Sequence, residues 1–310
     1  MTGAHGSSLA LSQNPLLAQL GYPQDARLVI FHADDVGMCH GSNVAFWELA
    51  AAGIVQTGSV MVPCPWSQEI LERAAADPLL DLGVHFTLNS EWSGYRWGPL
   101  STRDRASGLI DDEGWFWHRP PMLAERLNPA ATMAEMDAQI EHAVAAGLDL
   151  THLDAHMGAA MMGSLVQHYI ESGFRHRVPV LMPRLLDEGT RGIVGSSMSE
   201  ARWADFTGAL EKRGMPLVDT FRITPGYDVE GGEGGRAELY EKILRELPSG
   251  VTYFSLHPNA PGDIEAIVPD RAHWRTFEHA YFQSQQVRDL LIAEGIIPIG
   301  YRAIRAIMRM

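Results

Sequence analysis

The chain has 310 residues, of which 46% are hydrophobic and 20% charged, a composition typical of folded globular proteins. The net charge of -14 argues against nucleic acid and anionic membranes as partners, and no run approaches the roughly 20 apolar residues of a membrane span. The two cysteines, Cys39 and Cys64, exclude a disulfide framework and fit a cytoplasmic location.

In chain order, residues 1–26 are predicted to form a polar leader that lacks the basic region of a signal peptide and contains a short helix at Pro15–Leu20. Residues 27–310 are predicted to form a single domain in which strand-like runs alternate with helical segments. The predicted strands are Leu28–His32, Gly58–Val62, Leu82–Thr87, Asp149–Leu153, Val178–Met182, Leu217–Phe221, Val251–Leu256 and Ile296–Ile299. The predicted helices between them are Ser42–Ala52, Ser67–Ala76, Ala131–Ala146, Met198–Arg213, Ala237–Leu247 and Thr276–Glu294.

Most of the predicted strands are apolar on both faces, as expected of parallel strands covered by helices. About eight strand–helix units in one chain indicate an α/β fold, a distorted (β/α) barrel of mostly parallel strands. A doubly wound open sheet is the alternative. Residues 90–128 interrupt the alternation and read as an aromatic-rich insertion after the third strand.

Four short motifs lie at the carboxyl ends of predicted strands. They are H-A-D-D at 32–35, G-V-H-F-T-L-N at 83–89, T-H-L-D-A-H at 151–156 and S-L-H-P at 255–258. In a barrel or an open α/β sheet these strand ends gather on one face, which carries the site. Residues distant in sequence are therefore expected to converge there.

One aspartate and two histidines make a three-ligand metal site with open positions for water and substrate. A dication would also offset the desolvation of the adjacent carboxylates Asp34 and Asp35. One of them would bind the metal, and the other would act as a general base. Each motif has a simpler interpretation. The carboxylate pair can cap a helix, His85 can be a hydrogen-bonded core residue, and the H-x-D-x-H triplet can be a structural cluster. The coincidence of four motifs favours the metal site.

These residues resemble the YdjC/ChbG-type carbohydrate deacetylases, a divergent branch of the metal-dependent polysaccharide deacetylases. The resemblance runs from about Leu28 to the C-terminus. Its motifs are A-D-D-x-G followed by G-x-N (Ala33 to Asn43), G-x-H-x-x-L (Gly83 to Leu88), T-H-x-D-x-H (Thr151 to His156), P-R (Pro183, Arg184) and H-P (His257, Pro258). The chain departs from the family at Met157-Gly158, where many members continue with histidines, and at His32, where many have an apolar residue or Asn.

The resemblance implies a distorted (β/α) barrel that hydrolyses an N-acetyl group on an amino sugar such as a chitooligosaccharide. By the same resemblance, Asp35, His85 and His156 would bind one divalent metal ion, Zn²⁺ or Mg²⁺. Asp34 would be the base that activates water. His257 would protonate the leaving amine or stabilise the oxyanion.

Further residues are expected to support this site. By the resemblance, Asp154 would orient a metal ligand or a neighbouring histidine, the role expected beside metal-bound imidazoles. Arg184 would hold a carboxylate or a substrate oxygen. His152 belongs to the same supporting set, and His32 is expected to back the site by hydrogen bonding.

Two tryptophans of the insertion, Trp115 and Trp117, are candidates for stacking on sugar rings. The alternative is a lid whose aromatic residues form their own hydrophobic cluster. The expected partner is a small acetylated sugar. The oligomeric state is left open, a homodimer included.

Four other functions compete with this interpretation. The first is a metal-dependent amidohydrolase or esterase acting on a small non-sugar substrate. The second is a non-haem Fe(II) enzyme with two histidines and one carboxylate, although that chemistry usually occurs in antiparallel folds. The third is a metal-free glycosidase using Asp34 and Asp154 as its carboxylate pair. The fourth is a non-catalytic sugar-binding protein.

Overall fold

The computed structural model describes residues 14–195, 197–226 and 228–310. Residues 1–13 of the predicted leader lie outside this range. The strands are β1 (Arg27–Val36), β2 (Thr57–Val60), β3 (Asp81–Phe86), β4 (Leu153–Ala155), β5 (Thr220–Ile223), β6 (Gly250–Leu256) and β7 (Ile296–Pro298). The helices of nine or more residues are α2 (His40–Ala52), α3 (Ser67–Ala76), α5 (Pro129–Ala145), α6 (Leu165–His176), α8 (Glu200–Lys212), α9 (Gly232–Arg245), α11 (Ala272–Gln283) and α12 (Gln285–Ala293). The shorter helices are α1 (Pro15–Gln19), α4 (Pro120–Ala124), α7 (Glu188–Val194), α10 (Asp263–Ile267) and α13 (Tyr301–Met308), with 3₁₀ turns η1 (Arg105–Ser107) and η2 (His156–Met161).

All strand pairs among these seven strands are parallel, in the order β4-β3-β2-β1-β6-β5, with β7 beside the first residues of β1. An irregular segment, residues 178–185, lies between the two outer strands. Its Pro179 carbonyl accepts from the Leu153 N–H of β4, and its Arg184 N–H donates to Val218 just before β5. The strands therefore curl into the predicted distorted barrel. Their order argues against the doubly wound open sheet, in which the chain reverses direction from a central strand.

Several predicted boundaries are wrong. The predicted strand Val178–Met182 makes only isolated bridges, because Pro179 and Pro183 have no N–H to donate to a ladder. The strands predicted at Asp149–Leu153 and Leu217–Phe221 begin later, as β4 and β5. The predicted helix Thr276–Glu294 is two helices that meet at Ser284. This residue is extended, and its side chain accepts the Val287 N–H as an N-cap of α12.

The alternation of β1 divides the core into two clusters. Val29, Phe31 and Ala33 pack in the larger cluster with the surrounding helices. Leu28 and Ile30 belong to a second cluster inside the sheet, which α1 and α13 close with Leu16, Leu17, Tyr301 and Ile304. The inward positions further along β1 are His32 and Asp34. The interior thus changes along the strand from an apolar layer to a polar one at the carboxyl end.

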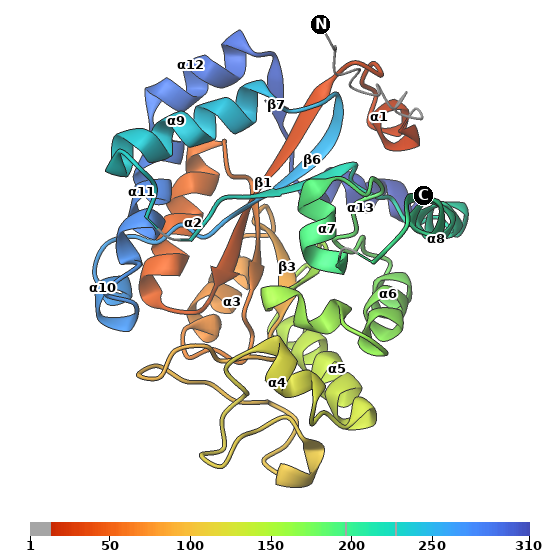
Figure 1. Cartoon of the computed structure of the whole chain (residues 1–310), viewed down its shortest axis with the longest axis vertical. Coiled ribbons are helices and arrows are strands. Elements are labelled where there is room, and N and C mark those ends of the chain that lie inside the picture. The colour runs from red at the N-terminus through yellow and green to blue at the C-terminus, as the bar shows by residue number, and fades with distance from the viewer. Residues whose placement is uncertain (1–13, 196, 227) are drawn as a thin grey trace, which may run out of the picture.

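The strands of Figure 1 point toward the segment between β3 and α5, drawn in orange and yellow. This segment covers the predicted insertion, residues 90–128, and contains η1, α4 and one antiparallel bridge, Ile110 to Phe116. Its side chains Trp97, Leu109 and Phe116 are buried and continue the main apolar core. The insertion therefore packs at the carboxyl ends of the strands.

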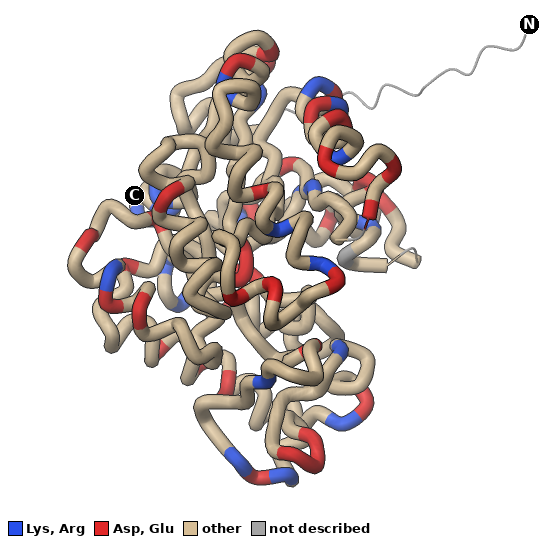
Figure 2. The backbone as a smooth tube through the Cα atoms, turned by 90° about the vertical axis from the view of Figure 1, so that its left-hand side faces the viewer, with Lys and Arg blue, Asp and Glu red and all other residues tan. Residues whose placement is uncertain are grey.

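No helix within the described ranges is long and apolar enough to cross a membrane. In the view of Figure 2, acidic and basic residues are interspersed over the outer helices and loops. No part of that view is dominated by Lys and Arg, in keeping with the net charge of -14.

Candidate active site

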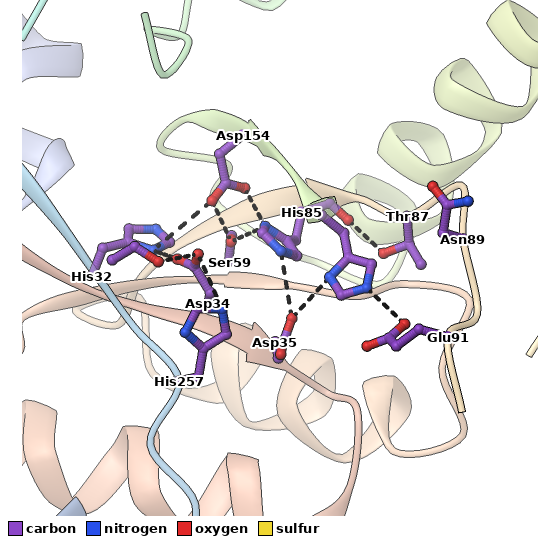
Figure 3. Close-up of polar contacts among 12 residues, drawn as sticks. His32, Asp34, Asp35, Ser59, His85, Thr87, Asn89, Glu91, Asp154 and His257 are labelled. Atoms are coloured by element: carbon purple, nitrogen blue, oxygen red, sulfur yellow. Dashed lines mark hydrogen bonds and ion pairs between the residues drawn. The ribbon is translucent and has the colours of Figure 1, made fainter. Parts of the chain in front are cut away.

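A β-bulge brings both carboxylates of the first motif to the same site. Adjacent residues of a regular strand point to opposite faces. In β1 the pairing with β2 shifts register between Ala33 and Val36, and Asp35 has a left-handed φ of 60°. Such bulges bend a strand and redirect a side chain. As a result Asp34 and Asp35 both face His85 of β3 and His257, which directly follows β6 (Figure 3).

Asp35, His85 and His156, the three predicted metal ligands, lie close together in the structure. The Nδ1 atom of His156 lies 3.0 Å from Asp35 Oδ1, and His85 Nε2 lies 3.5 Å from the same oxygen. All three side chains are buried, and their ligand atoms lie within 4.8 Å of one another. Two imidazole nitrogens directed at one carboxylate oxygen are the donor set that a divalent transition metal prefers. The residues therefore fit a metal ion.

The second nitrogen of each of these histidines faces another carboxylate. His85 Nδ1 lies 2.9 Å from Asp154 Oδ1 and 3.0 Å from the Ser59 hydroxyl. His156 Nε2 lies 3.0 Å from Glu91 Oε2. Carboxylates in this position fix the ring orientation and raise the basicity of metal-binding histidines. Asp154 was predicted for this role, whereas Glu91 was not.

Charges around the ligand set shift their pKa values in opposite directions. Burial alone would raise the pKa of Asp35, but His156 and the Arg275 guanidinium, 2.9 Å from Asp35 Oδ2, hold it well below its usual range. Burial alone would lower the pKa of His156, but Glu91 and Asp35 outweigh it and raise this pKa to about 9. The His85 pKa also lies well above its usual value, because Asp154 outweighs the effect of burial. The three groups thus form a buried, charge-compensated cluster.

Asp34 is held by three donors. His32 Nδ1 lies 2.6 Å and the Tyr253 hydroxyl 3.0 Å from its Oδ1 atom, and the Ser255 hydroxyl donates to Oδ2 at 2.7 Å. Burial acts to raise the pKa of Asp34, but His32 outweighs it and the pKa stays below its ordinary value. A carboxylate offers about four lone pairs, so one acceptor position on Oδ2 is left for a further donor.

His257 lies next to that oxygen. Its Nε2 atom is 3.9 Å from Asp34 Oδ2, and its backbone N–H donates to the buried Glu278 at 2.6 Å. Burial is the main cause that lowers the pKa of the His257 imidazole, although Asp35 and Asp34 act to raise it. The imidazole is therefore neutral at rest. As an acid it would first have to receive a proton, and Asp34 is the nearest carboxylate.

Asp154 is held inside the barrel. Its Oδ2 atom accepts from Ser59 at 2.9 Å and lies 3.0 Å from the Tyr253 hydroxyl, and the residue is 1% exposed. A carboxylate without access to solvent cannot contact a glycosidic bond. This placement argues against the glycosidase that would use Asp34 and Asp154 as its pair.

Arg184 is not brought to the site. Its guanidinium lies 3.0 Å from Asp219 and 3.1 Å from Glu211. Asp219 also accepts the N–H of Val251, near the start of β6, whereas the site lies at the opposite end of that strand. Arg184 thus holds carboxylates of the protein itself at the amino ends of the strands.

The two predicted stacking tryptophans lie in the insertion. Trp115 is 38% exposed, while the Trp117 ring is half-buried and donates its indole N–H to the Gly108 carbonyl. Three other tryptophans contact site residues. Trp97 lies beside His156, Trp274 beside His257, and Trp92 and Trp274 both pack on Arg275.

Some of the residues that sequence reasoning missed carried a signal. Tyr253 and Ser255 precede His257 at intervals of two in β6, so they share its face of the strand. The same rule applied to β3 places Gly83 with His85. No such signal marked Arg275 or Glu91. Arg275 lies in α11 and Glu91 in a loop, and the approach of both to the site depends on the tertiary fold.

A parallel barrel with a buried Asp-His-His cluster at the carboxyl ends of its strands places the chain among the α/β barrel proteins with titratable residues gathered at that face. More specifically, the chain belongs to the family described as YdjC-like protein, whose model matches residues 28–293.

The chain is similar to two curated proteins named carbohydrate deacetylase. The one from Thermus thermophilus is 30% identical over 94% of this chain and 98% of its own length. The one from Thermoanaerobacter pseudethanolicus is 27% identical over 75% of this chain and 81% of its own length. Among solved structures, a putative cellobiose-phosphate cleavage protein from Enterococcus faecalis superimposes with a TM-score of 0.69 at 20% identity. The superposition covers 90% of this chain and 99% of the Enterococcus faecalis chain. At this sequence identity the similarity supports the fold alone.

Proposed function

We propose that this protein is a metal-dependent carbohydrate deacetylase that removes the N-acetyl group from an amino sugar or a short oligosaccharide. The names of its relatives support deacetylation of a sugar. The observation that carries the metal dependence is the convergence of Asp35, His85 and His156 beside Asp34. Asp34 has an acceptor position left on Oδ2, on the side that faces His257.

Asp35, His85 and His156 would hold one divalent ion, Zn²⁺ or Mg²⁺. Such an ion lowers the pKa of a bound water and polarises a carbonyl oxygen. Nitrogen donors suit zinc better than magnesium, which prefers oxygen ligands. Asp154 and Glu91 would keep the two imidazoles oriented and basic.

The protein's own residues would move the protons. Asp34 accepts a proton from the attacking water on Oδ2 while the water oxygen bonds to the acetyl carbon and the π pair of the C=O bond moves onto the carbonyl oxygen. His257, neutral at rest, receives this proton. The pair on the oxyanion then re-forms the C=O bond as the C–N bond breaks, the C–N electron pair stays on nitrogen, and His257 protonates the leaving amine. The products are the free amino sugar and acetic acid, which loses its remaining proton to solvent to give acetate, and both residues return to their starting states.

A screen of acetylated amino sugars, with acetate as the product measured, tests the proposal. The purified protein is assayed as isolated, after chelation, and after Zn²⁺ or Mg²⁺ is added back. We expect acetate release that chelation abolishes and one of the metals restores. Full activity in the chelator would contradict metal dependence. No acetate from any N-acetyl sugar, with release from a non-sugar amide or ester, would favour the wider amidohydrolase or esterase class.

The Fe(II) alternative predicts a different result in the same preparation. An Fe(II) enzyme would contain iron and consume O₂ with an organic substrate, whereas a deacetylase consumes only water. The parallel barrel argues against it, because that chemistry usually occurs in antiparallel double-sheet folds. Metal analysis and an oxygen electrode would distinguish the two.

A further inference from the structure

Two buried imidazoles lie behind Asp34 and away from the ligand set. His32 Nδ1 is 2.6 Å from Asp34 Oδ1, and His32 Nε2 is 2.7 Å from His152 Nε2. Neither side chain has measurable exposure to solvent. The second nitrogen of His152, Nδ1, lies 2.9 Å from the Thr151 hydroxyl. The result is a continuous polar chain that runs from the proposed base into the barrel.

Packing fixes both rings in place. The Tyr253 ring stacks on His32 with centroids 4.8 Å apart, and the Tyr301 ring stacks on His152 at 4.1 Å. The space for the His152 ring exists because residue 83 is glycine. A Cβ atom there would lie 2.6 Å from His152 Nε2. The rings are therefore held in one orientation by neighbours on β3, β6 and α13.

The hydrogen bonds determine which nitrogen of each ring carries the proton. An ionised carboxylate can only accept, so His32 must donate from Nδ1 to Asp34. If this Nδ1 proton is the only ring proton of His32, its Nε2 is bare, and His152 must donate to it from its own Nε2. His152 Nδ1 is left as an acceptor for the Thr151 hydroxyl. Burial is the largest cause that holds the pKa of His152 well below its usual value, so His152 stays neutral.

We propose that His32 and His152 are paired positioning residues for Asp34. His152 holds neutral His32 in the tautomer that carries its proton on Nδ1, so His32 always presents an N–H to Asp34 Oδ1. This contact leaves Oδ2 as the oxygen that can accept a proton from water. The inference rests on the proposed function, since it assigns a role behind the base of that reaction. It also gives a specific role to His32, which the sequence predicted only to back the site by hydrogen bonding.

The groups that face this pair come from several elements. Asp34 on β1 and Asp154 on β4 are the two carboxylates, and Asp154 Oδ2 is 3.9 Å from His32 Nδ1. Tyr253 and Tyr301 supply the stacked rings. Asp81 lies at the far end, where the Thr151 hydroxyl also contacts it. If Thr151 donated to Asp81 instead, His152 would donate from Nδ1 and His32 would need protons on both nitrogens. That ordering is the main alternative.

Proton positions can be measured without turnover. Nitrogen-15 NMR of histidine-labelled protein, assigned with His32→Phe and His152→Phe, reports the protonated nitrogen of each ring. We expect His32 to carry its proton on Nδ1 and His152 on Nε2. A His32 with two protons, or with its single proton on Nε2, would overturn the proposal. So would a second metal ion bound per chain, because His32, His152 and Asp154 also have ligand atoms within 4.8 Å of one another.

Kinetics of four variants test the functional part. His32→Phe and His152→Phe keep a flat ring in each stack but lose the nitrogens. Each is expected to lower kcat by about 10- to 100-fold, the usual effect of removing a group that orients an active-site residue, with KM and bound metal unchanged. Because the two residues act as a unit, the double variant should be no slower than either single one. His32→Asn restores an N–H close to the position of Nδ1 and should recover part of kcat.

His168→Phe is the matched control, since His168 pairs with Asp137 on the outer helices. Multiplicative losses in the double variant, or an unchanged kcat in His32→Phe, would refute the pairing while leaving deacetylation intact. If the unmodified protein releases no acetate, the proposed function fails instead, and the tautomer measurement still stands on its own.

Discussion

Asp34 and Asp35 are neighbours in the chain, yet each is bound by a different histidine of the same site. His32 contacts Asp34 Oδ1 at 2.6 Å, and His156 contacts Asp35 Oδ1 at 3.0 Å. Asp35 lies among the candidate metal ligands, whereas Asp34 accepts hydrogen bonds from His32, Tyr253 and Ser255. The roles of the two carboxylates can therefore be tested separately by mutation.

Replacing Asp34 with Asn should remove the base and keep the metal. A general base contributes about 10²- to 10⁴-fold to a rate, so kcat for acetate release should fall within that range. Bound metal, measured by elemental analysis, should be unchanged. Asp35→Asn is the matched comparison and should lose metal as well as activity. Near-normal hydrolysis by Asp34→Asn would show that another group activates the water.

Replacing Glu91 with Gln should weaken metal binding. Glu91 accepts from His156 on the nitrogen that faces away from Asp35. Loss of such a carboxylate typically costs about 10- to 100-fold in metal affinity or activity. Competition with a fluorescent chelator measures the affinity. Glu113→Gln is the control, because Glu113 lies in the same insertion with an exposed side chain. Equal affinities in both variants would contradict the role of Glu91.

Metal binding should become tighter as pH rises. The pKa of His156 is raised to about 9 by Glu91 and Asp35, so at neutral pH this ring is protonated before metal binds. A ligand histidine must lose that proton. Affinity should therefore increase about tenfold per pH unit for each proton released, up to about pH 9. Calorimetry in buffers of different ionisation enthalpy counts the protons, and a count of zero at neutral pH would exclude this assignment.

Glu278 should make the fold less stable as pH rises. Burial raises the pKa of this carboxyl to about 7 despite hydrogen bonds from Tyr240 and the His257 N–H. An acid with a folded pKa above its unfolded value of 4.5 binds a proton on folding. Its stabilising contribution is complete below about pH 4.5 and is lost as pH rises through about 7. Glu278→Gln should flatten the decline of Tm over this interval, whereas Glu141→Gln, on an exposed helix face, should not.

Aromatic residues of the insertion are the candidates for sugar contact. Trp115→Ala should raise KM for a longer glycan and leave KM for a monosaccharide unchanged if this ring stacks on a distant sugar unit. Trp92→Ala should affect both substrates, because Trp92 packs on Arg275 beside Asp35. A change in Tm with no change in KM would instead assign Trp115 to the packing of the insertion.

Periodicity in the sequence was sufficient to predict parallel strands alternating with helices, but it left the doubly wound sheet open beside the barrel. It also placed His85, Asp154 and His156 at strand ends, where the structure brings their side chains together. Contacts between residues far apart in the sequence could not be predicted in the same way. Arg275 reaches Asp35 from 240 positions away, and no local pattern marks it. The P-R motif predicted that Arg184 would hold a carboxylate or a substrate oxygen, and its guanidinium lies beside the carboxylates of Asp219 and Glu211.

The backbone conformation at the β-bulge could not be predicted from the sequence either. Two adjacent aspartates in a strand-like run suggest opposite directions, and only the register shift between Ala33 and Val36 makes them converge. His32 and His152 illustrate a related difficulty. Two of the four motifs contained one of them each, but their contact depends on the space left by the missing side chain of Gly83, which is apparent only when β3 and β4 are placed side by side.

The left-handed backbone of Asp35 has a cost that the charges around it outweigh. A residue other than glycine is less stable in this conformation by about 1 kcal/mol. Glycine would remove that cost, but it would leave Arg275 and His156 without the buried carboxylate that they contact, and losing one partner of a buried ion pair costs about 3 to 5 kcal/mol. The aspartate therefore stabilises the fold in addition to offering a carboxylate beside the candidate metal ligands His85 and His156.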